Sequence, residues 1–282
     1  MKCRRQAANY TFKHSETRHF VKLGTQPDVR HDLKKAFDFV AKHDFNHIEL
    51  LLDHPLYSLD YLNPKDVLEL KSSYDIEVLL HAPSANTNFI ALSSFIRRAS
   101  YEELKRTCEF AEKCEAKVVT FHIGWNPGFI NAGKFYFDVS LYDKHNEKVL
   151  RNEMYKFLKD LDTNCILALE NTVLIERGLE SALNFLLENT DLALTFDVGH
   201  NNIVRNEFFI KNFNRVVNIH LHDNNGKRDE HLALGKGNVN LNEIPLKSYK
   251  NYLTIETREE NAIIETKNYL IRWLNEGQRN RV

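Results

Sequence analysis

The sequence lacks a long apolar run, an excess of charge of either sign, and a recognisable export signal. No stretch of about 18 consecutive apolar residues occurs, which argues against a transmembrane helix and a membrane partner. Lys and Arg number 38 against 39 Asp and Glu, so net charge gives no attraction toward nucleic acid. No apolar segment follows the basic residues 1–6. We therefore expect a cytoplasmic protein.

Cysteine is also scarce. The four cysteines, Cys3, Cys108, Cys114 and Cys165, include no CxxC pair, so they do not have the spacing of a zinc–thiolate site. We expect reduced thiols that pack in the interior, as is usual in a cytoplasm.

Apolar runs that resemble strands alternate with helical patterns along the chain. Most of the runs are continuous rather than alternating, which is typical of strands buried on both faces. Eight strands are expected, over His19–Gln26, His47–Asp53, Ile76–His81, Lys117–His122, Cys165–Glu170, Leu192–Asp197, Val216–His220 and Tyr252–Glu256.

Helical patterns fill most of the intervals between these runs. Asn63 and Pro64 predict an N-cap and first turn, and Ser100 followed by Glu103 predicts a capping box. The segment Leu241–Tyr249 contains Pro245, so we expect only short or broken helix there. The other predicted helices cover Asp32–His43, Lys65–Ser73, Glu147–Asp160, Gly178–Leu187 and Asn261–Leu274.

This alternation predicts an α/β fold with a parallel sheet and helical crossovers. The sheet could close into a (β/α)₈ TIM barrel or stay open and doubly wound. No GxGxxG follows the first strand, which disfavours a dinucleotide-binding open sheet. The 282 residues suit one barrel of about 250 residues, and no low-complexity linker divides them. We predict a single-domain TIM barrel over residues 19–282, preceded by a polar N-terminal arm over residues 1–18.

Six of the apolar runs end in a side chain that can bind a metal. The C-terminal ends of barrel strands meet at one face, which carries the catalytic groups, so these side chains should lie together. The six are His81, His122, Glu170, Asp197, His220 and Glu256, and the following loops add His200, Asp229 and His231.

Three clustered carboxylates would repel one another and resist burial. A divalent cation offsets both effects. Imidazole and carboxylate ligands without a thiolate suit Zn²⁺ or Mn²⁺. Each residue alone has a plain structural explanation, such as a hydrogen-bonded core histidine or a helix cap. The joint pattern favours a metal site, with one to three ions left open.

With these residues in place, the chain resembles the xylose-isomerase-like TIM barrel superfamily, which includes sugar phosphate isomerases and epimerases and the endonuclease IV-like AP endonuclease family 2. The resemblance runs from about His19 to Leu274. Its motifs are Leu80-His81-Ala82-Pro83, Phe121-His122-Ile123-Gly124, Leu169-Glu170-Asn171-Thr172, Phe196-Asp197-Val198-Gly199-His200, His220-Leu221-His222-Asp223-Asn224, Asp229-Glu230-His231 with Leu234-Gly235-Lys236-Gly237, and Ile255-Glu256-Thr257.

In the isomerase and epimerase branch, the resemblance implies one Mn²⁺-like ion held by Glu170, Asp197, His220 and Glu256. Glu170 and Glu256 would then act as catalytic acid and base on a small sugar, polyol or sugar phosphate, through an enediolate. Further side chains near the motifs are predicted to bind substrate, although each also has a structural explanation. They are Trp125, His222, Lys227, Arg228 and Arg258.

In the endonuclease IV branch, the resemblance implies three zinc ions that hydrolyse DNA at abasic sites. The first ion would take His81, His122 and Glu170; the second Glu170, Asp197, His220 and Glu256; the third His200, Asp229 and His231. All nine residue types match.

Two departures disfavour this branch. His122-Ile123-Gly124 stands where that branch has His-Pro-Gly, and residues 53–57 contain no Arg or Lys where it has a basic, aromatic DNA loop. We therefore expect a metal-dependent sugar isomerase or epimerase first, an abasic-site endonuclease with DNA as its partner second, and a non-catalytic sugar- or metal-binding barrel third.

Overall fold

The barrel is built from strands buried along nearly their whole length. The computed structural model describes residues 21–173 and 177–279, so the predicted arm over residues 1–18 lies outside the described part. Eight parallel strands close in the order β1-β10-β9-β8-β7-β4-β3-β2. The predicted (β/α)₈ TIM barrel is confirmed. Its strands are β1 (Lys22–Thr25), β2 (His47–Leu51), β3 (Glu77–His81), β4 (Val118–Phe121), β7 (Ile166–Glu170), β8 (Ala193–Asp197), β9 (Val216–Leu221) and β10 (Tyr252–Ile255).

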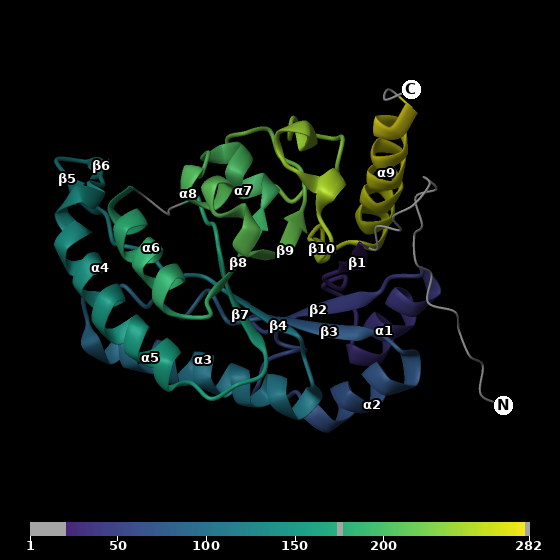
Figure 1. Ribbon diagram of the computed structural model, residues 1–282, viewed down its shortest axis with the longest axis horizontal. Coiled ribbons are helices and arrows are strands. Elements are labelled where there is room, and N and C mark those ends of the chain that lie inside the picture. The colour runs from purple at the N-terminus through teal and green to yellow at the C-terminus, as the bar shows by residue number, and fades with distance from the viewer. Residues whose placement is uncertain (1–20, 174–176, 280–282) are drawn as a thin grey trace.

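Helices surround the strands (Figure 1). Asp32 and Asn63 cap α1 and α2, accepting hydrogen bonds from the backbone N–H groups of Lys35 and Lys65. The helices are α1 (Leu33–Lys42), α2 (Pro64–Tyr74), α3 (Ser94–Cys114), α4 (Asp143–Val149), α5 (Tyr155–Asp160), α6 (Glu180–Asn189), α7 (Val198–Ile203), α8 (Glu207–Lys211) and α9 (Glu260–Arg279). Within the described ranges, no helix has both the length and the apolar character needed to cross a membrane.

The helix predictions hold with differences in detail. The segment around Pro245 forms two short 3₁₀ turns, Leu241–Glu243 and Leu246–Ser248, as expected. A π-helical turn over Leu150–Met154 joins α4 to α5 within one continuous helical stretch. Helices α7 and α8 were not predicted, because their short stretches show no clear helical periodicity.

The predicted helix start at Ser100 is wrong, since α3 begins at Ser94. The Ser100 hydroxyl accepts the Asn88 N–H at 2.7 Å and donates to the Ile96 carbonyl at 2.8 Å. The serine therefore ties the preceding loop to the middle of a helix instead of capping its end. A Ser-x-x-Glu pattern inside a longer helix looks the same in the sequence.

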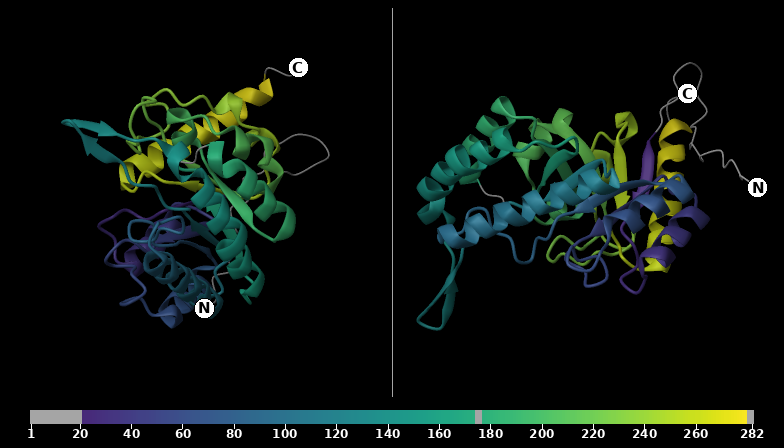
Figure 2. Two further views of the ribbon diagram at one scale, coloured as in Figure 1. Left: turned by 90° about the vertical axis from the view of Figure 1, so that its left-hand side faces the viewer. Right: turned by 90° about the horizontal axis from the view of Figure 1, so that it is seen from below.

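A small hairpin after β4 was also not predicted. Strands β5 (Phe129–Asn131) and β6 (Lys134–Tyr136) pair antiparallel and project from the body of the barrel (Figure 2). Ala132 and Gly133, which join them, both have positive φ, 49° and 77°, as a type I′ turn requires. The Ala-Gly step between aromatic residues was the available signal.

Candidate metal centre

The nine predicted metal-binding residues converge on the C-terminal face of the barrel. Glu170 and Asp197 end β7 and β8, His81 ends β3, and His220 lies one residue before the end of β9. His122 and Glu256 follow β4 and β10 directly, and the remaining residues, His200, Asp229 and His231, come from the helix and loop that follow β8 and β9.

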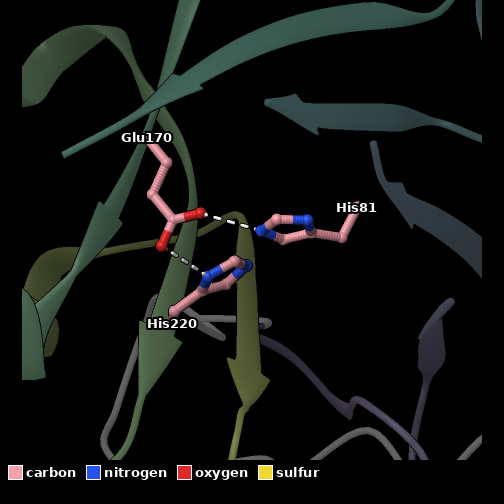
Figure 3. A group of neighbouring side chains, drawn as sticks. All are labelled: His81, Glu170 and His220. Carbon is pink, nitrogen blue, oxygen red and sulfur yellow. Dashed lines mark hydrogen bonds and ion pairs between the residues drawn. The ribbon is translucent and has the colours of Figure 1, made fainter. Parts of the chain in front are cut away.

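The first group is Glu170 with the histidines around its carboxylate. Figure 3 shows two of them, His81 and His220. Glu170 Oε2 lies 3.1 Å from His81 Nε2 and 3.0 Å from His122 Nε2, and its Oε1 lies 3.2 Å from His220 Nδ1. Glu170 is only 1% exposed. A carboxylate whose two oxygens face different histidines has the geometry needed to share two cations.

The second group is the most buried. Ligand atoms of Glu170, Asp197, His220 and Glu256 all lie within 4.8 Å of one another. Glu256 Oε2 lies 2.9 Å from His220 Nδ1, yet this buried oxygen has no hydrogen-bond partner. A buried carboxylate oxygen without a hydrogen bond, beside two more carboxylates, fits a divalent cation.

The third group surrounds Asp229. His200 Nε2 and His231 Nε2 lie 3.2 and 3.0 Å from Asp229 Oδ2. His222 is buried beside them, with Nε2 at 3.0 Å from Asp197 Oδ1 and its ring stacked on His231 at 4.2 Å. The position of His222 favours a role in holding the Asp197 carboxylate by a hydrogen bond. The alternative role, contact with a substrate, stays a prediction.

Backbone carbonyls fix the tautomers of three histidines. Nδ1 lies 3.0 Å from the Ala82 carbonyl in His81, 2.8 Å from the Asn171 carbonyl in His200 and 2.8 Å from the Glu256 carbonyl in His231. A carbonyl oxygen only accepts, so Nδ1 carries the proton in each case. The lone pair of Nε2 is then free to face the centre.

Burial and pairing compete in setting the charges of the centre. Burial raises the pKa of Glu170, but His220 and other histidines outweigh it and hold the pKa well below its usual range. Burial lowers the pKa of His220, but Glu49 and Glu170 outweigh it and raise the pKa well above its usual range. Without a cation, histidine protons therefore balance the carboxylates. A bound cation would displace those protons.

Residues 37–276 match the sequence family described as xylose isomerase-like TIM barrels. The chain belongs to this family. The match covers strands β2 to β10 and every residue of the three groups, so the sequence resemblance is confirmed at the level of the superfamily.

Named relatives in this family are divergent in sequence. The uncharacterised protein MJ1311 of Methanocaldococcus jannaschii is 27% identical over 265 residues, covering 86% of this chain and 85% of that protein. The crystal structure of a D-tagatose 3-epimerase-like protein aligns with a TM-score of 0.74 and 26% identity, over 93% of this chain and 100% of the other. The IolI protein, crystallised with a zinc atom, aligns with a TM-score of 0.69 and 17% identity, over 90% and 98%.

The predicted substrate-binding residues differ in exposure and in their contacts. Trp125 is 41% exposed, and Lys227 and Arg228 are exposed and form no ion pair with any described residue. Arg258 is held: its Nε donates to Gln26 Oε1 at 2.8 Å and its Nη2 pairs with Glu256. The roles of these four side chains remain predictions.

The sequence reasoning assigned no role to two buried residues beside the centre. Glu49 lies in the middle of β2 and is fully buried, and a charge inside the apolar run at residues 47–51 was the available signal. Asn171 directly follows Glu170, and its side chain hydrogen-bonds the backbone of Asp197. Asn171 belongs to the motif Leu169-Glu170-Asn171-Thr172, but the motif does not indicate this contact.

Proposed function

We propose that the protein is a divalent-metal-dependent isomerase or epimerase that acts on a small sugar, polyol or sugar phosphate. The observation that carries this proposal is the buried group of Glu170, Asp197, His220 and Glu256, whose ligand atoms lie within 4.8 Å of one another. The overall likeness to a D-tagatose 3-epimerase-like structure supports the same class of reaction.

Zn²⁺ or Mn²⁺ is the cation that this donor set suits best. When bound, the ion would polarise a substrate carbonyl and its neighbouring hydroxyl, which acidifies the C–H bond between them. Asp197 and His220 would serve to hold the ion, since both are fully buried and neither reaches outward.

Glu170 and Glu256 would move the proton. They come from β7 and from the residue after β10, which β8 and β9 separate in the barrel, so the two carboxylates approach the centre from different sides. One would remove the proton from carbon and the other would return it to the opposite face or to the adjacent carbon, through an enediolate. Arg258, which pairs with Glu256, would keep that carboxylate ionised.

Proton exchange from D₂O into a panel of sugars, polyols and sugar phosphates tests this proposal. We expect exchange that depends on added Mn²⁺, Co²⁺ or Zn²⁺ and falls by about 10²–10⁴-fold in Glu256→Gln. Glu77→Gln is the matched control, because Glu77 also lies in a barrel strand but pairs with Lys22 at the opposite end, at 2.8 Å. Absence of exchange across the panel in metal-loaded protein would contradict the proposal.

A zinc phosphodiesterase that cleaves DNA at abasic sites is the second candidate. The contacts of the predicted residues with Glu170 and Asp229 favour it, and the compact groups of ligand atoms near Asp197 and Asp229 also include His222. Incision of a duplex that contains a tetrahydrofuran site, together with nearly three zinc atoms per chain, would support it. Equal inactivity of zinc-loaded and EDTA-treated protein would eliminate it. Stabilisation by a sugar without turnover in either assay would identify a binding barrel instead.

A further inference from the structure

Nitrogen atoms of three side chains contact the buried carboxylate of Glu49. Its Oε1 lies 2.9 Å from Gln26 Nε2 and 2.9 Å from His220 Nε2, and its Oε2 lies 2.7 Å from Asn218 Nδ2. Glu49, Asn218 and His220 are each 0% exposed. A buried charge persists only when such donors surround it, and here one of them is a candidate metal ligand.

His220 differs from the other histidines in how it is held. His81, His200 and His231 each turn Nδ1 to a backbone carbonyl and present Nε2 to the centre. His220 is reversed, with Nδ1 facing Glu170 and Glu256 and Nε2 facing Glu49. It is therefore the one of these four whose outer nitrogen meets a side chain, so a substitution can test what holds it.

The orientation of Asn218 supports this assignment. Its Oδ1 accepts the Thr254 hydroxyl at 2.8 Å, so its amide nitrogen faces Glu49. Asn218 Nδ2 also lies 3.1 Å from His220 Nε2, and these two nitrogens lie 2.7 and 2.9 Å from the oxygens of Glu49. With a cation in the centre, Nδ1 of His220 would be its ligand, and Nε2 would carry the proton that Glu49 accepts.

We infer that Glu49 is a positioning residue that fixes the tautomer and ring direction of His220, so that Nδ1 can bind the cation. The inference rests on the proposed function in one respect, namely that a cation binds between Glu170, Asp197, His220 and Glu256. In this role Glu49 would act through His220 rather than directly on the substrate or the cation.

The same carboxylate reaches a second functional candidate through Gln26. By accepting from Gln26 Nε2, Glu49 turns Gln26 Oε1 outward, where it accepts from Arg258 Nε at 2.8 Å. A chain of polar contacts thus joins the candidate ligand His220 to Arg258, which pairs with Glu256. Loss of Glu49 loosens His220 directly and Arg258 indirectly.

Zinc affinity of Glu49→Gln tests the inference, with Glu77→Gln as the matched control. The amide of a glutamine can turn its NH₂ group toward His220 and favour the wrong tautomer. Competition with a chromophoric chelator should give zinc binding about 10–100-fold weaker in Glu49→Gln and unchanged binding in Glu77→Gln. Thermal melts of the metal-free proteins show whether each variant is folded. A folded Glu49→Gln that binds zinc like the wild type would overturn the inference.

A measurement on the wild type covers the case in which Glu49→Gln does not fold. In zinc-loaded, ¹⁵N-labelled protein, with His220→Asn identifying the signals, His220 should show a protonated Nε2 and a metal-bound Nδ1. The opposite tautomer overturns the inference while leaving the proposed function intact. A wild type that binds no divalent ion contradicts the proposed function itself, so the two failures are distinguishable.

Discussion

The side-chain amide of Asn171 forms two hydrogen bonds with the backbone of Asp197 on the neighbouring strand. Asn171 Oδ1 accepts the Asp197 N–H at 2.7 Å, and its Nδ2 donates to the Asp197 carbonyl at 2.9 Å. The Asn171 carbonyl also accepts from His200 Nδ1 at 2.8 Å. A residue with no ligand atom at the centre therefore fixes two candidate ligands, and its removal should affect both stability and metal binding.

Replacing Asn171 with leucine should destabilise the metal-free protein by about 2–4 kcal/mol. The substitution leaves the N–H and carbonyl of Asp197 buried without these partners, at roughly 1–3 kcal/mol each. Urea denaturation in EDTA measures the free energy of unfolding. Asn189→Leu is the control, because Asn189 is exposed and its side chain, among residues 21–173 and 177–279, bonds only the Phe185 carbonyl of its own helix. Equal stability of the two variants would show that the Asn171 contacts contribute little.

The metal-free protein should lose stability as pH rises from about 6.5 to 9 because of His222. Burial lowers the pKa of His222, but Asp197 outweighs it and raises the pKa to about 9. Between these pH values the folded state binds a proton that the unfolded state releases, so the free energy of unfolding falls as pH increases. The contribution is about 3 kcal/mol at most.

His222→Asn isolates this effect, since an asparagine amide can donate to Asp197 at every pH. Melts of both proteins in EDTA across this range should show a flatter pH dependence in the variant. Parallel curves would mean that His222 does not carry the proton. With zinc present, the wild type should behave in the opposite sense, because metal binding requires neutral histidines and strengthens as pH rises.

The barrel could be predicted because its strands are continuous apolar runs, and few other segments of the chain show such a run. Each run ends at the face where side chains become polar, so Glu170 and Asp197 mark both a strand end and a site. The start of α3 could not be placed, since Ser100 makes contacts with Asn88 that only the folded chain reveals. The hairpin at Phe129 was missed because each of its strands has only 3 residues.

The convergence of the candidate residues on one face could be predicted from the sequence, and the contacts between them less so. Position at a strand end selected six of the nine residues, and the segments that follow β8 and β9 supplied His200, Asp229 and His231. Glu49 was missed because it lies inside a predicted strand rather than at its end, and its partners Gln26 and Asn218 show only in the folded chain. Those partners lie 23 and 169 residues away in the chain, and no local pattern encodes such a contact.

Asp197 and Asp229 should respond differently to substitution if one ion is sufficient for the reaction. Asp197→Asn removes a ligand of the buried group and should weaken metal binding and proton exchange by at least about 100-fold. Asp229→Asn disrupts only the group with His200 and His231 and should leave exchange within about tenfold of the wild type. Elemental analysis and D₂O exchange measure both effects. Equal loss in the two variants would indicate that several ions act together.

Lys227 and Arg228 should matter only for phosphorylated substrates. Both are exposed without an ion pair to any described residue, so alanine at either position should leave the melting temperature unchanged. A charge-assisted hydrogen bond to phosphate contributes roughly 1.5–3 kcal/mol, so its loss should raise KM for a sugar phosphate by about 10–100-fold. KM for the neutral sugar should stay constant.

Lys250→Ala provides the control for this pair, because Lys250 is also exposed but precedes β10 at the opposite end of the barrel. A rise in KM for the sugar phosphate in Arg228→Ala or Lys227→Ala but not in Lys250→Ala would locate the phosphate beside the loop that follows β9. The same KM in all three variants would show that the loop cations are solvated charges. Arg258 would then be the remaining predicted cation near the centre, and its pairing with Glu256 would make a neutral sugar the better candidate substrate.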